Sequence, residues 1–507
     1  MGLTLLTERH ADQIAGVLCC YDRILVFGTL PGICFADGMT SYLYEHHVRI
    51  FDYPRFAEPF RNQLRENAER LAAENGLQIE HIRKNNFRKE DRIHKVLAKR
   101  GEHPGLVWIF SALEACATYK PWYDKQTGRA YLKPDEGRCL HYYFYFIDEE
   151  LGLCYVRVPT WLPCRLQIYF NAHNWLAAQL NKRGIGHRLL DNAFLHIDDW
   201  AQAQRIADGW QAKRIHWRLD EFAKRFCPIF RHFRVRYHWS VDQCEYATDI
   251  VFRRQQDLQA IYGNLTRTAI HTVKPDNIAT FLGRKLTGNY QDEMGNRLNI
   301  RIEGTRIKHT MGPVSIKLYD KFGLILRIET TVNEVSFFKH YRQVEHRDGS
   351  REMKYAGMLK TIYSLPALRE LLVAANRRYL EFLSTINDPS AGIDKLNRVS
   401  KTVHQNDCSY AGFNFFDDDD QMLFEALARG EFNISGLHNK TLRPHLAGKT
   451  SGQVSRLLKR LRLHGLIRKV GRTYKYYLTA LGKQVIAAGL KLKELFLVPQ
   501  LAFGPVQ

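Results

Sequence analysis

Residues 449–493 read KTSGQVSRLLKRLRLHGLIRKVGRTYKYYLTALGKQVIAAGLKLK and contain twelve Lys or Arg side chains and no Asp or Glu. One buried helical face is predicted by the i, i+3, i+4, i+7 spacing of Val454, Leu457, Leu458 and Leu461. The opposite face carries Arg456 and Lys459, and Gly465 then ends the helix at its C-terminus. The segment therefore predicts a helix with one apolar side and one basic side.

A β-hairpin is expected directly after this helix. Residues 467–470 and 473–478 read as strands on either side of the pair Gly471-Arg472, and glycine at the first central position suits a two-residue turn. Thr479 can cap a further helix that starts at residue 480. Helix, basic strand, tight turn, Tyr-rich strand and helix is the layout of a winged helix, so the segment predicts a domain that grips a nucleic-acid duplex.

The whole chain has 507 residues and a formal net charge of +21. This length predicts about two to four domains, and the basic balance predicts a polyanionic partner, usually nucleic acid. A basic enzyme without such a partner is the alternative. The ten cysteines form no Cys-x-x-Cys pair, and no signal peptide or membrane-spanning stretch is recognised. Reduced thiols and a cytoplasmic, nucleoid-associated protein without a membrane partner are expected.

The fold class expected for the body of the chain is α/β or α+β, in several domains. Over residues 1–200, strands alternate with helices, which predicts an α/β domain. The helices are expected at 4–20, 38–47, 54–75, 88–100 and 173–183, and the strands at 23–30, 48–51, 106–111 and 165–170. Residues 139–161 predict an antiparallel hairpin rich in aromatic side chains.

A central mixed domain is expected over residues 201–385. Its pattern predicts helices at 198–225, 241–262 and 365–385 and an antiparallel β region at 297–333. Residues 229–239 alternate apolar or aromatic with basic side chains, which indicates a strand with one basic face or a linker, and the strand is favoured. Residues 386–416 show little periodicity and predict a linker. The winged-helix domain is then expected over 417–507, where four consecutive aspartates precede its first helix.

The C-terminal domain resembles winged helix-turn-helix proteins of the MarR type, on the segments LLKRLRLHGLIRK and YKYYLTALGKQVI. The resemblance implies that the basic helix enters the major groove while the hairpin touches the phosphate backbone. The residues implied to face nucleic acid are Gln453, Ser455, Arg456, Lys459, Arg460, Arg468, Lys469, Arg472 and Lys475. Winged helices also serve as protein-binding or dimerisation modules, and a homodimer is left open.

A second pattern carries candidate chemistry. The stretch SIKLYDK at 315–321 is followed by LRIET at 326–330. As strands, they place Lys317, Tyr319 and Lys321 on one face, and Arg327 and Glu329 on one face of the next strand. Lysines near a tyrosine suit attack on phosphate, because they stabilise both the phenolate and the phosphoryl oxygens.

This strand pair resembles the Tyr-Asp/Asn-Lys and Arg-Ile/Leu-Glu strands of phage and plasmid rolling-circle replication initiators. The resemblance implies a tyrosine nickase with Tyr319, Lys321 and Glu329 in catalysis, and a divalent Mg or Mn ion held by Glu329. The chain lacks the His-hydrophobe-His pair of the wider tyrosine nickases. The alternative is a hairpin whose charged side is solvated or binds backbone phosphates.

Other acidic residues could contribute to a metal site. Glu245 and Asp249 are four residues apart on a predicted helix, where they could bind a metal together or pair with Arg253 and Arg254. Asp22 and Asp52 flank predicted strands, but the sequence does not say whether they converge. Asp148, Glu149 and Glu150 lie in a predicted turn, where carboxylates are usually solvated.

Two aromatic and basic stretches suggest stacking platforms for unpaired bases. CLHYYFYFI at 139–147 and RHFRVRYHW at 231–239 place flat rings next to charged or polar side chains. Aromatic strands are also good core strands, so both interpretations stay open. No phosphate-binding loop of the Gly-x4-Gly-Lys-Ser/Thr or Gly-x-Gly-x-x-Gly kind is present.

The first hypothesis is a DNA-binding protein of a mobile element, such as a replication initiator or a transposase-like nuclease or strand transferase. The body also resembles uncharacterised multicopy bacterial proteins, on CYDRILVFGTLP, LHYYFYFIDEELGL and DNAF. The alternative is a non-enzymatic MarR-type regulator or an RNA-binding ribonucleoprotein component, without a cofactor. DNA is favoured over RNA as the partner.

Overall fold

The computed structural model describes residues 5–83, 86–286, 293–301, 304–386, 390–429, 431–432, 436–471, 473–494 and 498. The chain divides into two compact units, Met1–Asn387 and Asp388–Gln507. Among the residues described, no helix is both long and apolar enough to cross a membrane.

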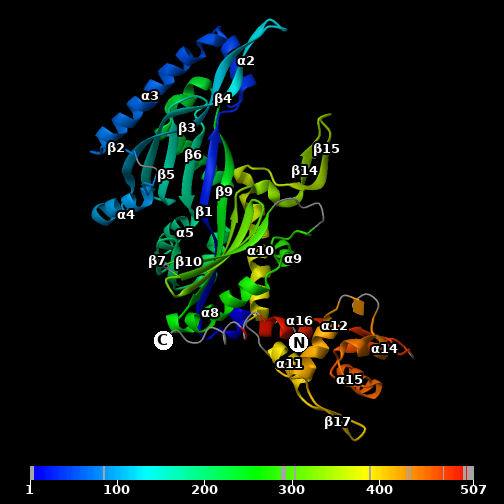
Figure 1. Ribbon diagram of the computed structural model, residues 1–507. Coiled ribbons are helices and arrows are strands. Elements are labelled where there is room, and N and C mark those ends of the chain that lie inside the picture. Colours follow the sequence, from blue (N-terminus) through cyan, green and yellow to red (C-terminus); the bar gives the residue numbers. More distant parts are fainter. Residues whose placement is uncertain are drawn as a thin grey trace. The chain divides into compact units, whose positions relative to one another are not determined.

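The first unit is built on one eleven-stranded sheet with the order β10-β11-β12-β13-β9-β1-β6-β5-β4-β3-β2 (Figure 1). Its strands are β1 (Ile14–Thr29), β2 (Ile79–His81), β3 (Gly105–Asp124), β4 (Arg129–Asp148), β5 (Gly152–Pro159), β6 (Leu166–Asn171), β9 (His238–Phe252), β10 (Met294–Arg301), β11 (Gly304–Met311), β12 (Val314–Lys321) and β13 (Ile325–Val332). The sheet is mixed, because β2 and β3 run parallel whereas the other neighbours are antiparallel.

The central strand β1 joins sequence-distant parts of the sheet. It pairs with β6 on one side and with β9 on the other. The expected boundary at residue 200 therefore falls inside one sheet, because β1–β6 and β9–β13 share hydrogen bonds across the β1–β9 pair. The helix expected at 4–20 is wrong beyond the short α1 (Leu6–Arg9), since β1 already starts at Ile14. A strand buried on both faces reads as a continuous apolar run, which periodicity does not distinguish from a buried helix.

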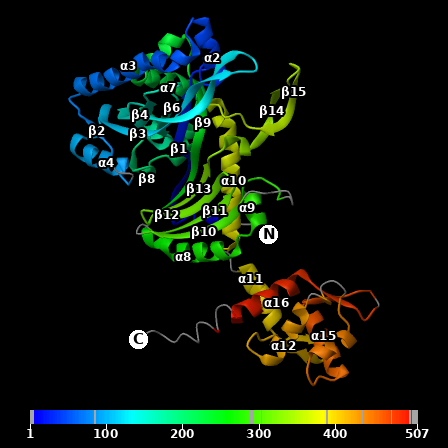
Figure 2. The ribbon, with the colours of Figure 1, turned by 45° about the horizontal axis from the view of Figure 1, so that its top comes forward.

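Helices cover the sheet. They are α2 (Ala36–Glu45), α3 (Tyr53–Glu74), α4 (Lys89–Arg100), α5 (Ala172–Asn181), α6 (Trp200–Asp208), α7 (Ala212–Phe226), α8 (Gln255–Thr272), α9 (Pro275–Phe281) and α10 (Leu365–Ile386). On one face of the sheet, α10 packs against β9 and β13 (Figures 1 and 2). Its Leu368 and Leu372 share a core with Tyr246 of β9 and Ile328 of β13. We call this the α10 face, and the other side the open face.

Two short hairpins complete the first unit. The pair β7 (His187–Leu190) and β8 (Ala193–Ile197) contacts β9, and Ala193 packs with Val251 and Ile325 on the open face. The pair β14 (Lys339–Glu345) and β15 (Arg351–Gly357) projects away from the sheet in Figures 1 and 2. Short 3-10 turns lie at Ile50–Asp52, Pro228–Phe233, Val335–Phe337 and Ile362–Ser364.

Two predicted elements around β9 are wrong. The stretch 241–262 is not one helix, because β9 runs to Phe252 and α8 starts only at Gln255. Glu245 and Asp249 still share one face, since a separation of four residues does so in a strand as well as in a helix. Within residues 229–239, only 229–233 belong to a 3-10 turn and only 238–239 belong to a strand, the start of β9. Tyr237 and Trp239 are buried in the core rather than exposed as a platform. The strand expected at 48–51 is a 3-10 turn as well.

The second unit contains α11 (Ser390–Ser400), the pair β16 (Val403–Gln405) and β17 (Cys408–Tyr410), α12 (Asp418–Ala428), α14 (Asn439–Leu442), a 3-10 turn at Arg443–His445, α15 (Ser451–Leu463), the pair β18 (Ile467–Lys469) and β19 (Tyr476–Leu478), and α16 (Ala480–Leu492). Three of these elements, α11, β16 and β17, lie within the stretch 386–416 that was expected to be a linker. Val399 and Phe413 are buried in the core of this unit. In α15, Val454, Leu458 and Leu461 form the buried face.

Candidate metal centre and nucleic-acid surface

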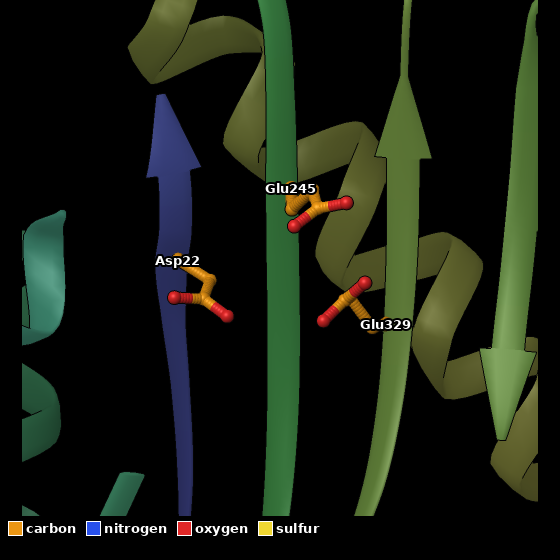
Figure 3. A group of neighbouring side chains, drawn as sticks. All are labelled: Asp22, Glu245 and Glu329. Atoms are coloured by element: carbon orange, nitrogen blue, oxygen red, sulfur yellow. The ribbon is translucent and has the colours of Figure 1, made fainter. Parts of the chain in front are cut away.

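Three carboxylates from three adjacent strands converge on the open face of the sheet. Asp22 lies on β1, Glu245 on β9 and Glu329 on β13, and one oxygen of each lies within 4.8 Å of the others (Figure 3). Asp22 and Glu329 are buried, whereas Glu245 is half-buried. We call these three residues the acid cluster. Oxygen ligands of this kind suit Mg²⁺ or Mn²⁺.

A β-bulge places Asp22 in the acid cluster. Tyr21 pairs with Tyr246 and Ile24 pairs with Cys244, so two residues of β1 lie opposite Glu245 alone. Such bulges re-aim side chains and are common beside functional sites. Tyr21 packs against Tyr246 on the α10 face, while Asp22 points to the open face.

Lys317 of β12 bridges two of the acids. Its Nζ donates to Glu329 Oε1 at 2.5 Å and to Glu245 Oε1 at 3.0 Å. Burial, together with the nearby Glu329, raises the pKa of Glu245 above its ordinary value. Although burial alone would lower the pKa of Lys317, the two glutamates raise it, so this side chain stays an ammonium ion. The cluster thus holds one cation already, at a point between the two glutamates.

Asp22 is surrounded by donors. Its Oδ1 accepts from Asn171 Nδ2 at 2.5 Å, and its Oδ2 accepts from Arg327 at 3.0 Å and from Asn192. His173 Nδ1 lies 3.6 Å from Oδ1. Burial works to raise the pKa of Asp22, but His173 and Arg327 outweigh it and hold the pKa below its ordinary value. Asp22 is therefore an ionised, firmly oriented carboxylate.

Asp249 does not join the acid cluster, so its expected place in a shared metal site with Glu245 is wrong. Both of its oxygens accept from Arg327, at 2.6 Å from Nε and 2.6 Å from a terminal nitrogen. Arg327 is fully buried and also contacts Asp22. A bidentate guanidinium–carboxylate pair is strong and directional. Asp249 thus holds the guanidinium group of Arg327, and Arg327 in turn positions the carboxylate of Asp22.

Tyr319 lies beside the acid cluster. Its hydroxyl donates to Glu329 Oε2 at 2.6 Å, and burial together with Glu329 raises its pKa well above the ordinary value. Lys321, in contrast, donates to Asn192 rather than to Tyr319 or Glu329. Burial lowers the pKa of Lys321 to about 8. The structure therefore brings Tyr319 and Glu329 into hydrogen-bond contact. Lys321 instead lies against Asn192.

A basic strip continues from the acid cluster toward the edge strand β10. Arg306 pairs with Tyr319, and Lys308 pairs with Lys317, across the β11–β12 ladder. Arg297 lies opposite Lys308 on β10. Burial and the charges of Lys317, Arg306 and Arg297 lower the pKa of Lys308, which places these cations near one another. The spacing Arg306-x-Lys308 was visible in the sequence, but only the strand order joins it to the acid cluster.

A cavity of about 810 Å³ opens on the other side of the cluster. Asp22 and Glu245 line one wall, and Tyr145, Tyr155 and Tyr169 line another. The rings of Tyr155 and Tyr169 are stacked, with centroids 5.3 Å apart and an interplanar angle of 12°. Asn171 and Asn192 add amide groups to the lining. The cavity combines aromatic surface with hydrogen-bonding groups next to the acids.

The remaining acids considered in the sequence lie elsewhere. Asp148 lines the same cavity but pairs with Arg218. Glu150 pairs with Arg214 and, at 3.2 Å, with Lys182. Despite some burial, these cations lower the pKa of Glu150. Asp52 precedes α3 and is exposed.

In the second unit, α15 presents several of the expected residues. Arg456 and Lys459 belong to its outer side, and Lys459 lies over the ring of Tyr410 at 5.1 Å. Gln453 caps the helix start by accepting from Thr450 N, and Ser455 accepts from Asn439. In the hairpin, Arg468 is exposed, and Lys469 and Lys475 lie 5.4 Å from the rings of Tyr474 and Tyr477. Arg472 lies outside the described residues.

Arg460 does not face outward, contrary to the expectation. It makes a bidentate pair with Asp420 at 2.6 and 2.8 Å and donates to the carbonyls of Ala411 and Gly412. Its guanidinium lies 3.9 Å from the ring of Phe413. Arg460 thus ties α15 to α12 and to the segment after β17.

No family model, curated protein or solved structure matches the chain.

Proposed function

We propose that the protein is a metal-dependent DNA nuclease and strand transferase of a mobile element, with replication initiation as its task. The observation that carries the proposal is the hydrogen bond between Tyr319 and Glu329, inside a group of three carboxylates from three adjacent strands. A nucleophile within hydrogen-bond distance of a base, beside metal-binding oxygens, is a suitable arrangement for phosphoryl transfer.

Each residue has a defined role in this reaction. Glu329 accepts the phenolic proton, and Tyr319 Oη attacks the phosphorus of a DNA phosphodiester. The bond from phosphorus to the 3′ oxygen breaks, and the proton held by Glu329 passes through water to that oxygen, which leaves as a free 3′ hydroxyl. The products are a 5′ phosphotyrosine and a 3′ end, and the reverse reaction joins strands. Asp22, Glu245 and Glu329 would hold a Mg²⁺ or Mn²⁺ ion, which would withdraw charge from the phosphoryl oxygens.

The surroundings of the acid cluster suit a DNA strand. Arg297, Arg306 and Lys308 offer cations to its phosphates. The cavity with Tyr155 and Tyr169 offers ring faces to an unpaired base. A DNA strand with one base in this cavity and its phosphates on the basic strip would lie across Tyr319.

The second unit supplies targeting in this proposal. The helix α15, the hairpin β18–β19 and the helix α16 follow the order of a MarR-type winged helix. Arg456 and Lys459 would contact the duplex from the helix, and Arg468, Lys469 and Lys475 from the hairpin. Gln453 and Ser455 would lie at the helix start, near the groove.

The test is formation of a covalent adduct. The full-length protein is incubated with single-stranded and supercoiled DNA in Mg²⁺ or Mn²⁺, and protein-linked 5′ ends and nicks are measured. Tyr319→Phe should abolish both, by about 10³-fold or more, as for loss of a catalytic nucleophile. The matched control is Tyr341→Phe, since Tyr341 is an exposed tyrosine of β14. Equal adduct yield from Tyr319→Phe and wild type would refute the nucleophile.

A non-enzymatic nucleic-acid-binding protein is the second candidate. The observation that favours it is that Lys317 and Arg327 already neutralise part of the acid cluster without a metal. A buried network satisfied in this way can be purely structural. This candidate predicts sequence-specific duplex binding, no cleavage of DNA or RNA, and no Mn²⁺ binding to the cluster.

A further inference from the structure

A second cavity, of about 420 Å³, lies among the ends of α5, α6 and α7. Three arginines line it, one from each neighbouring stretch: Arg183 after α5, Arg205 in α6 and Arg214 in α7. No Asp or Glu is among its lining residues in the described part of the chain. Such a concentration of guanidinium groups without acids attracts an anion.

Two buried donors without an acceptor belong to residues that line this cavity. Gln179 and Trp210 are 6% and 8% exposed, and neither Gln179 Nε2 nor Trp210 Nε1 has a hydrogen-bond partner among the described residues. Arg183 donates to the backbone carbonyl and to Oε1 of Gln179, at 2.9 and 3.1 Å. This contact fixes the amide so that its oxygen is used and its NH₂ group is left over. Buried donors normally have partners, so a missing acceptor is indicated.

Nearby carboxylates leave much of this positive charge uncompensated. Asp208 accepts from Gln204 and pairs with Arg369, and neither carboxylate of this neighbourhood, Asp208 or Glu150, lines the cavity. Glu150 pairs with Arg214 at its surface-exposed end. Arg183 and Arg205 have no ion pair with a carboxylate among the interactions found in the described residues. At least two guanidinium groups are therefore available to an anionic ligand.

The cavity is separate from the acid cluster. Trp210 packs on Tyr21 and Phe170, which point to the α10 face, whereas Asp22 points to the open face. A single DNA strand that lies across Tyr319 on the open face would therefore not also occupy this cavity. Its volume suits a molecule of nucleotide size rather than a polymer.

We propose that this arginine cavity binds a small phosphorylated ligand of nucleotide size. Arg183 and Arg205 hold the phosphate oxygens, Arg214 stays paired with Glu150, and Gln179 and Trp210 donate to an acceptor of the same ligand. The ligand site is independent of the proposed nuclease, because it shares no residue with the acid cluster.

Titration calorimetry of the full-length protein tests this inference, with adenosine triphosphate in the absence of metal and with inorganic phosphate as probes. Adenosine triphosphate should bind, and Arg205→Ala and Arg183→Ala should each weaken it by about tenfold or more. Arg205→Lys should restore part of the affinity, and the exposed Arg253→Ala should leave it unchanged. No binding of either probe, or equal binding in wild type and both alanine variants, would overturn the inference.

Competition with a single-stranded oligonucleotide separates the two sources of phosphate. If the oligonucleotide displaces adenosine triphosphate and itself loses affinity in Arg205→Ala, the cavity binds backbone phosphates, and the small-ligand inference is wrong. If adenosine triphosphate binding is lost in Arg205→Ala while oligonucleotide binding persists, the inference holds. Covalent adduct formation by Tyr319, measured in the same variants, reports independently on the proposed nuclease.

Discussion

The acid cluster and helix α15 carry charge in opposite ways. In the cluster, ionised groups from β1, β9, β12 and β13 are buried and satisfy one another over long sequence distances. In α15, the basic residues are close together in the sequence, and they are exposed or half-buried. Arg460 is the exception in α15, because it is held by a carboxylate in the same bidentate way as Arg327 in the cluster, although it was expected to face nucleic acid. Charge in a sequence indicates binding only where the fold leaves it without an internal partner.

The largest expected effect comes from removing the buried arginine of the cluster. Arg327→Met leaves Asp22 and Asp249 without their cation and should lower the free energy of unfolding by about 3–5 kcal/mol. All eight tryptophans lie in the first unit, so urea unfolding followed by tryptophan fluorescence reports on that unit alone. The control is Arg377→Met, which removes an exposed pair with Glu381 and should change stability by less than about 1 kcal/mol. Equal losses of unfolding free energy in the two variants would mean that the buried ion pairs of Arg327 stabilise the fold no more than a surface ion pair does.

Metal affinity should respond next. Glu329→Gln keeps the volume of the side chain but removes one charged ligand and the base beside Tyr319, and should weaken Mn²⁺ binding by about 100-fold. Electron paramagnetic resonance of Mn²⁺ in the full-length protein measures this loss. The matched control is Glu352→Gln, which lies on the projecting strand β15. Unchanged Mn²⁺ affinity in Glu329→Gln would assign the acid cluster a structural role only.

The two arginines of α15 should behave differently. Arg456→Ala should weaken duplex binding several-fold and reduce the salt slope of log K by about 1, as expected for loss of one phosphate contact. Arg460→Ala should instead destabilise the second unit, because Asp420 loses its partner, and should leave the salt slope unchanged. Fluorescence anisotropy with a labelled duplex over a salt series, and thermal unfolding by circular dichroism, measure the two quantities. A reduced slope in Arg460→Ala would place this side chain on DNA after all.

The last expected effect is a pH dependence from Lys321. Its pKa is about 8 in the folded protein, below the value of about 10.4 in an unfolded chain. Between these values the unfolded chain binds more protons, so this residue makes stability rise as pH increases from about 8 to about 10.4. Lys321→Met should remove this contribution. Urea unfolding of both proteins at pH 7.5 and 9.5, conditions on either side of about 8, compares the two changes in stability. The same pH dependence in both would exclude Lys321 as the source.

Local patterns predicted the elements whose residues have clear periodicity. The long helices at 54–75, 88–100 and 365–385, the aromatic hairpin before residue 159 and the β region at 297–333 all appear as elements of these types. The face shared by Lys317 and Tyr319 was also predicted correctly, since the side chains of a strand alternate. Errors concentrate in β1 and β9, the two strands at the centre of the sheet. Nearly all of their residues are buried or half-buried, and β9 places the half-buried Glu245 and the buried Asp249 among apolar residues, so neither strand shows the alternation of apolar and exposed polar residues that identifies a strand.

The sequence by itself determined the charge of the protein, the basic face of α15, and the neighbourhood of Tyr319 and Glu329, because these depend on residues near one another in the chain. Only the tertiary structure decided that Asp22 and Glu245 join Glu329, that Asp249 does not, and that Arg460 is occupied. The physical reason is that strand pairing and a β-bulge bring residues 22, 245 and 329 together, and no local pattern specifies which strands pair.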